Sequence, residues 1–313
     1  MNKPLKRSLQ FVVILFIAAN VVAAMHAYKF THYSTDGERV SELGLSLSQK
    51  LKLVVTGVDL PRPENTAFPQ HPCTAVTIPS NVPLGCWYIP SLTPQPKGTV
   101  IIFHGYSSNK SSLTGRAEPF LQDGYNCLLV DFMGSGTSGG NATTIGYKEA
   151  QEVKDCFEYI KAQGETHIFL YGSPMGAVAI MKAISYEHIT PKAIIIECPF
   201  ASMYETVAIR FKNMGIPTFP MAHLLMFWGG VENGFWAYGH NPAEYAKHIH
   251  CPVLLQYGEK DERVARSETD HIFANLHEPK QLITYPLAGH DDYHRQYGRV
   301  WASNMTKFLD QVK

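Results

Sequence analysis

Residues 168–177 read I-F-L-Y-G-S-P-M-G-A, and this stretch decides the predicted fold. Ile168 to Tyr171 are apolar or aromatic, which is the pattern of a short buried strand. Gly172 interrupts that pattern, and from Met175 a helical spacing begins, with apolar residues recurring on one face. The stretch therefore predicts a strand, a tight turn and a helix in direct succession.

The same alternation of short apolar strands and helical patterns continues on both sides of this stretch. Strands are predicted at residues 99–103, 127–130, 193–196, 253–257 and 281–285, and helices at 111–121, 144–162, 266–276 and 300–312. Such alternation predicts an α/β fold with a mostly parallel central sheet covered by helices on both faces. Residues 73–90 carry two short strand patterns around a Pro-flanked turn, and they predict an antiparallel hairpin at the start of the sheet.

Composition limits the class of protein. The chain has 313 residues, enough for one large α/β domain with a sizeable core. Its 27 basic residues balance 27 acidic ones, so we expect no nucleic acid or other polyanion as a partner. An aromatic content of 12% argues against disorder.

The N-terminus has the pattern of an export signal. Lys3, Lys6 and Arg7 precede residues 11–25, which are apolar except for Asn20. This pattern predicts either an uncleaved signal-anchor or a cleaved signal peptide, and the lack of a clean A-x-A site favours the anchor. Basic residues before the span place the rest of the chain outside the cytoplasm, at the membrane or, if the signal is cleaved, secreted. We divide the chain into an anchor or signal (1–28), a lead-in segment (29–72) and the main domain (73–313).

One insertion interrupts the alternation. Residues 201–240 are rich in Met, Leu, Phe and Trp, unlike a polar loop. We interpret them as a small apolar lid over the carboxyl ends of the strands, where α/β sheets bind ligands. The alternative is an extra helix that covers the core and has no role in binding.

The cysteines and histidines form no metal-binding motif. None of the six cysteines belongs to a C-x-x-C, and no H-E-x-x-H occurs among the 14 histidines. Cys127, Cys156 and Cys198 lie in apolar patterns typical of small core residues. Cys73 and Cys86 flank the predicted hairpin turn, and in an oxidising compartment they would form either a disulfide or two free thiols.

Five short motifs follow predicted strands in a fixed order. They are His104-Gly105-Tyr106, Asp131-x-x-Gly134-x-Gly136-x-Ser138, Glu197-Cys198-Pro199-Phe200, Gly258-Glu259-Lys260-Asp261 and Gly289-His290. Together they resemble the α/β-hydrolase superfamily over residues 73–313, most closely its serine-aminopeptidase-like and small-esterase branch. The resemblance implies hydrolysis of an ester, thioester or amide, with no metal or organic cofactor. The apolar lid suggests that the substrate carries an apolar group.

The resemblance also implies roles for individual residues. His290 would be the general base and Asp261 the carboxylate that orients it. The backbone amides of Tyr106 and Met175 would form the oxyanion hole. Gly172 and Gly176 would match the glycines of the G-x-S-x-G elbow, which carries the nucleophilic serine.

The chain departs from the superfamily at the nucleophile itself. Pro174 stands where the elbow has its serine, and Ser173 lies one residue early. The elbow serine adopts a positive φ, whereas proline holds φ near −65° and suits the first turn of a helix. We therefore expect a relaxed turn with Pro174 at the start of the helix. Two interpretations stay open: an enzyme that uses Ser173 instead, or a non-catalytic pseudohydrolase that serves as a binding or partner domain.

Overall fold

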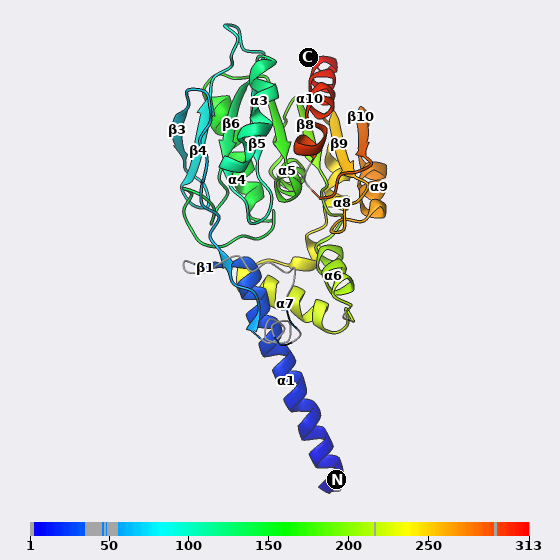
Figure 1. The fold of residues 1–313 in the computed structure, drawn as a ribbon. Coiled ribbons are helices and arrows are strands. Elements are labelled where there is room, and N and C mark those ends of the chain that lie inside the picture. The colour runs from blue at the N-terminus through cyan, green and yellow to red at the C-terminus, as the bar shows by residue number, and fades with distance from the viewer. Residues whose placement is uncertain are drawn as a thin grey trace. The chain divides into compact units, whose positions relative to one another are not determined.

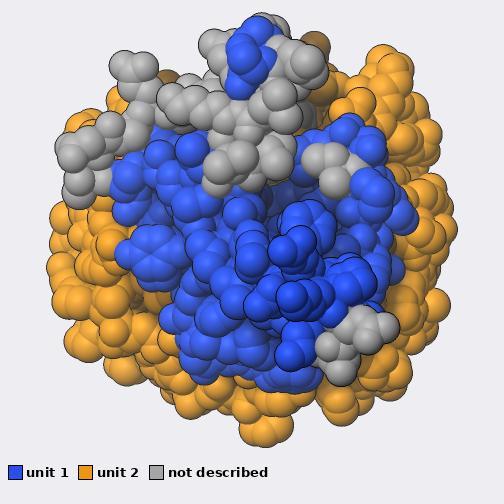
Figure 2. Space-filling view, turned by 90° about the horizontal axis from the view of Figure 1, so that it is seen from below, with its two compact units in different colours: residues 1–61, 203–240 blue, residues 62–202, 241–313 orange. Residues whose placement is uncertain are grey.

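The computed structural model describes residues 3–34, 46, 48, 56–215, 217–290 and 293–312. It divides into two compact units, which Figure 2 shows in different colours. The larger unit comprises residues 62–202 and 241–313, and the smaller one residues 1–61 and 203–240. Much of the predicted lead-in segment, and Asp291 beside His290, lie outside the described residues.

The larger unit is built on one central sheet (Figure 1). Within the described ranges it has eight strands, in the order β10-β9-β8-β7-β5-β6-β4-β3. Their bounds are β3 Thr74–Ile78, β4 Leu84–Ile89, β5 Thr99–Phe103, β6 Asn126–Val130, β7 Ile168–Gly172, β8 Ala193–Glu197, β9 Val253–Gly258 and β10 Lys280–Tyr285. Strands β5 to β10 pair in parallel, whereas β4 is antiparallel to both β3 and β6. The predicted parallel sheet with an antiparallel hairpin is confirmed.

Helices cover both faces of this sheet. Their bounds are η1 Lys110–Leu113, α3 Thr114–Gln122, α4 Glu149–Ala162, α5 Pro174–Glu187, α8 Pro242–Tyr245, η3 Ala246–His248, α9 Arg266–Asn275 and α10 Tyr293–Gln311. Side chains of α4, α5 and α9 join one hydrophobic cluster, and those of α3 and α10 join a second. Alternate residues of each strand supply the two clusters: Leu170 belongs to the first and Tyr171 to the second. The core is therefore split by the sheet, as expected for a parallel sheet buried on both faces.

Two predicted helix boundaries were wrong. The helix predicted over 144–162 begins at Glu149, because Ile145 and Gly146 adopt positive φ values of 56° and 97° that no right-handed helix contains. The closing helix, predicted over 300–312, begins at Tyr293 and contains a break at Gly298 (φ 26°, ψ −95°). Before α4 the positive-φ residues override the apolar periodicity, whereas the helix predicted over 300–312 is the part of α10 that follows the break at Gly298.

Of the two alternatives for Cys73 and Cys86, a disulfide or two free thiols, the structure shows the free thiols. Both are free thiols, Cys73 exposed and Cys86 buried. The hairpin register places Cys86 opposite Val76, three residues beyond Cys73, so the two cysteines are not cross-strand neighbours. The buried Cys86 thiol instead donates to the Leu84 carbonyl at 3.8 Å.

The smaller unit combines the N-terminal helix with the predicted lid. It contains α1 Lys3–Thr31, the parallel pair β1 Tyr33–Ser34 and β2 Leu60–Pro61, α6 Met203–Asn213, α7 Met221–Asn233 and η2 Ala237–Gly239. Helix α1 is long and apolar enough to cross a membrane, a test that a signal sequence also passes. The lid segment is thus helical and packs with α1, since α1 and α7 are in direct contact. Its placement over the strands of the larger unit stays a prediction.

Candidate functional site

The predicted base and its orienting carboxylate lie side by side. His290 follows β10 and Asp261 follows β9, so the parallel sheet brings them to the same edge. His290 Nδ1 lies 2.8 Å from Asp261 Oδ2, and Oδ1 of the same carboxylate accepts the backbone amides of Arg263 (2.7 Å) and Val264 (2.9 Å). The carboxylate is fully buried and the imidazole is 18% exposed. With Nδ1 donating to Asp261, Nε2 of His290 is left as the proton acceptor, as base catalysis requires.

A third side chain, Cys198, approaches this pair. The Cys198 sulfur, a carboxylate oxygen of Asp261 and a ring nitrogen of His290 all lie within 4.8 Å of one another. Cys198 follows β8, is buried, and has a positive φ of 35°. The sequence predicted only a small core residue here and missed this neighbourhood. Its position directly after a strand of the same parallel sheet was the signal that could have revealed it.

Sulfur, nitrogen and oxygen ligands of this kind are those that zinc prefers. However, the 2.8 Å separation of Nδ1 and Oδ2 is that of a hydrogen bond, and the second oxygen of Asp261 already accepts two amides. The arrangement as it stands is a hydrogen-bonded His–Asp pair with a thiol beside it.

The turn between β7 and α5 has the relaxed geometry predicted for it. Ser173 is the N-cap of α5, with φ −75° and ψ 172°, and Pro174 is the first helical residue. The Ser173 amide donates to Phe103 O (3.1 Å), and its carbonyl accepts from Ala177 N (2.6 Å). Ser173 is only 1% exposed, and among the described side chains no hydrogen bond joins its hydroxyl to His290. The positive-φ conformation that projects an elbow nucleophile is therefore absent from the described residues of this turn.

The two elbow glycines are required by close backbone contacts. A Cβ on Gly172 would lie 2.4 Å from the amide nitrogen of Ala177, and one on Gly176 would lie 2.6 Å from the carbonyl oxygen of Phe103. Both distances are well inside van der Waals contact, and the atoms met belong to the backbone of neighbouring elements. The close strand–turn–helix packing at Gly172 and Gly176 is thus present, with Pro174 between the two glycines.

We expect Gly176→Ala to lower the free energy of unfolding by about 1–3 kcal/mol, because the methyl group must displace β5 or α5. Gly229→Ala in α7 is the matched control, since its Cβ would meet nothing closer than Ala27 Cβ at 3.9 Å. A helical glycine with that space should be neutral or gain up to about 1 kcal/mol on change to alanine. Thermal melts of the two variants measure this difference in stability. Equal melting midpoints would show that the contact between β5 and α5 is not tight.

His104 of the predicted oxyanion loop has a structural role. Its Nε2 accepts the Phe132 amide (3.0 Å), so its Nδ1 donates to the Gly105 carbonyl (2.7 Å). Burial is the main cause that lowers the pKa of His104, which keeps the ring neutral. With both nitrogens engaged, His104 links the loops after β5 and β6 and is not available as a base.

The two predicted oxyanion donors occupy positions suited to that role. Tyr106 follows Gly105 directly and is half-buried. Met175 is the second residue of α5, and the first four amides of a helix have no acceptor within the helix. The structure thus places both residues at loop or helix starts after neighbouring strands β5 and β7.

A buried ion pair, which the sequence did not predict, holds the loop after β6. Lys110 Nζ pairs with Asp131 Oδ2, and the Lys110 side chain is 1% exposed while that of Asp131 is 0% exposed. Asp131 also accepts the amides of Lys110 (2.7 Å) and Thr137 (2.8 Å) and the side chain of Asn65 (2.9 Å). Burial alone would raise the pKa of Asp131, but the Lys110 charge outweighs it and the pKa is lowered. This network fixes the loops that flank the site.

A second buried carboxylate supports the elbow from the other side. Glu149 accepts the hydroxyls of Thr143 and Thr144, both at 2.6 Å, and the amides of Thr144 and Gly146. The Thr143 hydroxyl in turn contacts the Met175 sulfur at 3.4 Å. The residues before α4 are therefore tied to the first turn of α5, which carries the candidate oxyanion amide.

Known proteins resemble the chain in both sequence and fold. Residues 94–228 match the family model of serine aminopeptidase, S33. The chain is 26% identical over 253 residues to the Bacillus subtilis protein YqkD, a match that covers 79% of this chain and 82% of that one. It is 23% identical over 229 residues to a lysophosphatidylserine lipase of Mus musculus, covering 65% of this chain and 56% of the lipase.

The solved structure of an esterase from Pyrococcus furiosus matches with a TM-score of 0.68 at 25% identity, covering 80% of this chain and 96% of the esterase. The family match includes the loop after β5, the Asp131 loop and the turn between β7 and α5. The chain is therefore a member of the α/β-hydrolase superfamily.

Proposed function

We propose that this protein is of the serine-hydrolase type, built for an ester, thioester or amide, and that its turnover is absent or feeble because the nucleophile position is held by Pro174. The observation that carries the proposal is the buried, doubly anchored Asp261 carboxylate at 2.8 Å from His290 Nδ1. A base oriented in this way serves acyl transfer, and it stands at the strand ends where the superfamily performs that chemistry.

The proposed substrate carries an apolar acyl group. Supporting observations are the apolar segment 201–240, which we propose as a lid over Ser173, Asp261 and His290, and the similarity to an esterase and to a lysophosphatidylserine lipase. In the reaction, Nε2 of His290 would take the nucleophile's proton, and the amides of Tyr106 and Met175 would stabilise the oxyanion.

A reactive phosphonate that labels activated serines tests the site directly. We expect the wild-type chain to remain unlabelled and Pro174→Ser to become labelled, because the new hydroxyl would lie within reach of His290. Labelling of the wild type that disappears in Ser173→Ala would instead identify Ser173 as a working nucleophile.

The second candidate function is that of a pseudohydrolase, in which the same fold binds a ligand or a partner without turnover. The observation that favours it is the relaxed backbone of Ser173, whose φ of −75° points to a helix cap and not to an elbow nucleophile. This reading gains support if neither wild type nor Pro174→Ser reacts with the phosphonate although both are folded.

We further propose that α1 anchors the protein in a membrane and that the remaining chain is extracytoplasmic. The helix is long and apolar, and Lys3, Lys6 and Arg7 precede its apolar part. In a bacterial host, we expect the protein in the membrane fraction, and protease added to spheroplasts should digest all but the anchor. A soluble protein that resists the protease in intact spheroplasts would contradict both the anchor and the export.

A further inference from the structure

Helix α7 packs closely along the C-terminal half of α1. Ala23, Ala27 and Thr31 are the buried residues of α1. Gly229 of α7 faces Ala27, so that small residues allow the two backbones to approach. Two polar contacts lie on either side of the contact between Gly229 and Ala27.

The polar contacts also show the direction of α7. Trp228 Nε1 donates to Asn20 Oδ1 at 3.1 Å, and Asn233 Nδ2 donates to Thr31 Oγ1 at 3.1 Å. The later residue of α7 meets the later residue of α1, so the helices run in the same sense. The first turns of α7 therefore point back toward the N-terminal, lipid-facing part of α1.

With α1 as the proposed membrane anchor, the position of these contacts along the helix would put them at the level of the far leaflet. At a rise of about 1.5 Å per residue, Asn20 lies about 20 Å and Ala27 about 30 Å along the helix from Arg7. The hydrocarbon core of a bilayer is about 30 Å thick. Beyond that depth, Lys29 pairs with Asp59 at 3.0 Å and the Arg210 guanidinium lies 4.6 Å from the centre of the Phe30 ring.

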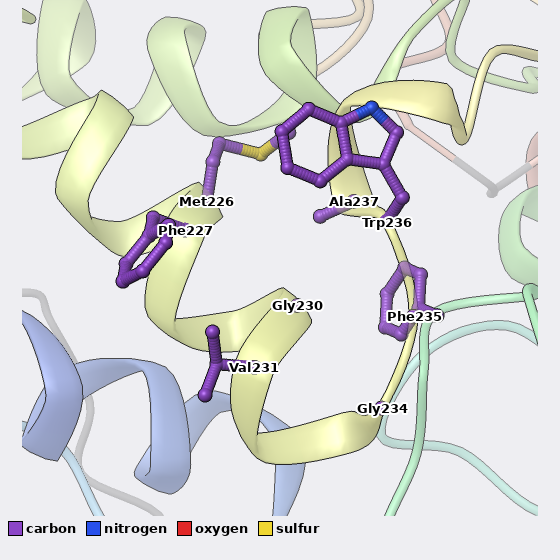
Figure 3. A pocket seen from close by; sticks show the side chains of 8 residues that line it. All are labelled: Met226, Phe227, Gly230, Val231, Gly234, Phe235, Trp236 and Ala237. Atoms are coloured by element: carbon purple, nitrogen blue, oxygen red, sulfur yellow. The ribbon is translucent and has the colours of Figure 1, made fainter.

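The outer surface of α7 and of the turns around it is apolar. Phe227 is 47% exposed, Val231 55%, Trp236 66% and Phe219 76%. Within α7 the one charged residue is Glu232, in the last turn. A pocket of about 360 Å³ lies at the end of α7, lined by Phe227, Val231, Phe235 and Trp236 among others. Figure 3 shows the residues that line it. Aromatic side chains around an open apolar pocket are poorly suited to water and well suited to the membrane interface.

This inference rests on the proposal above that α1 is the membrane anchor. We propose that α7 and the turns beside it lie in the leaflet that surrounds the C-terminal half of α1. The pocket of Met226, Phe227, Val231, Phe235 and Trp236 then binds acyl chains of the bilayer lipids. Helices α1 and α7 are then the membrane-embedded part of the smaller unit, with the Lys29–Asp59 ion pair at headgroup level. A volume of about 360 Å³ suits part of an acyl chain and not a whole lipid. Segment 201–240 is thereby a lipid-contacting element as well as the proposed lid.

Site-specific labelling of the full-length chain in lipid vesicles tests the proposal. Cys73 and Cys251, the cysteines that are not buried, are first changed to serine. An environment-sensitive fluorophore is then attached at Phe227→Cys and, separately, at Trp236→Cys. The matched controls are Ile14→Cys on the lipid-facing side of α1 and Leu287→Cys in the larger unit, which are 62% and 66% exposed. Vesicles of phosphatidylcholine are compared with vesicles that carry a nitroxide on the acyl chain, and iodide serves as the aqueous quencher.

We expect the acyl-chain nitroxide to reduce fluorescence at positions 227, 236 and 14 by at least about twofold, as for groups within an interface, and iodide to quench only position 287. Quenching of 227 and 236 by iodide, with position 14 still quenched by the nitroxide, would overturn the proposal while leaving the anchor intact. Iodide quenching at position 14 as well would refute the anchor and this inference together. If neither quencher reaches 227 and 236, protein covers α7, and the lipid proposal is wrong. Two positions in the proposed membrane segment are labelled so that the test still works if one variant fails to fold. Circular dichroism shows whether each variant is folded.

Discussion

Pro174→Ser should raise the hydrolysis of a short-chain p-nitrophenyl ester by about two orders of magnitude or more, since loss of one triad member commonly costs several orders. The change restores a hydroxyl at the position between Gly172 and Gly176 and frees φ at the turn in one step. Two features favour this gain: His290 Nδ1 lies 2.8 Å from the Asp261 carboxylate, and the close backbone contacts at the two glycines are present. Steady-state turnover by the purified full-length chain measures the effect.

Three matched variants isolate the source of the gain. Pro174→Ala frees the turn without adding a hydroxyl and should stay at the wild-type level. Pro174→Ser combined with His290→Ala should lose the gain, because the hydroxyl then has no base. Pro174→Ser combined with Cys198→Ala should keep most of it, since Asp261 rather than the thiol orients the imidazole.

Two results would contradict this account. Vigorous turnover by the wild type that disappears in Ser173→Ala would mean that Ser173, at the helix cap, is a competent nucleophile. No gain in a folded Pro174→Ser would mean that the site has lost more than its serine, and the pseudohydrolase would then be the better interpretation.

The largest expected effect on stability comes from Lys110→Met, which should lower the free energy of unfolding by about 3–5 kcal/mol at neutral pH. The substitution removes the counter-charge of Asp131, whose side chain is 0% exposed, and leaves that carboxylate ionised in the interior. Lys97→Met is the matched control, because Lys97 pairs with Asp123 at 3.3 Å with a 37% exposed side chain. Loss of an exposed pair should cost about 0–1 kcal/mol.

The pH dependence of the free energies of unfolding of the wild type and of Lys110→Met provides an independent check. In the wild type, Lys110 holds the pKa of Asp131 below its unfolded value. The pair therefore stabilises the fold above that unfolded pKa, near about 4, and its contribution is lost as the pH falls through the lower folded pKa. In Lys110→Met, burial without the lysine charge raises the pKa of Asp131, so the variant takes up a proton above about pH 4, whereas the wild type does so only below it. The difference in the free energy of unfolding should therefore narrow progressively as the pH falls from 7 to 3. Denaturant unfolding at pH 7 and pH 3 measures this, and a constant difference would show that the lost interaction is not ionic.

The sequence alone determined the architecture of the larger unit and the positions of its motifs. Buried strands such as Thr99–Phe103 and Ile168–Gly172 are continuous apolar runs, a local pattern that needs no knowledge of their neighbours. Motifs that follow parallel strands lie at one edge of the sheet, and the resemblance to the α/β-hydrolase superfamily implied that Asp261 pairs with His290 there. The relaxed turn was equally predictable, because the proline ring restricts φ whatever surrounds it.

The tertiary structure decided what depends on partners distant in sequence. Cys198 was predicted as a core residue, and only the neighbouring strand ends bring Asp261 and His290 to its thiol. Hairpin register, set by the turn between β3 and β4, separated Cys73 from Cys86. The ion pair of Lys110 with Asp131 and the packing of α7 on α1 join residues tens to hundreds of positions apart. No local periodicity encodes such contacts, because they follow from which surfaces the folded chain brings together.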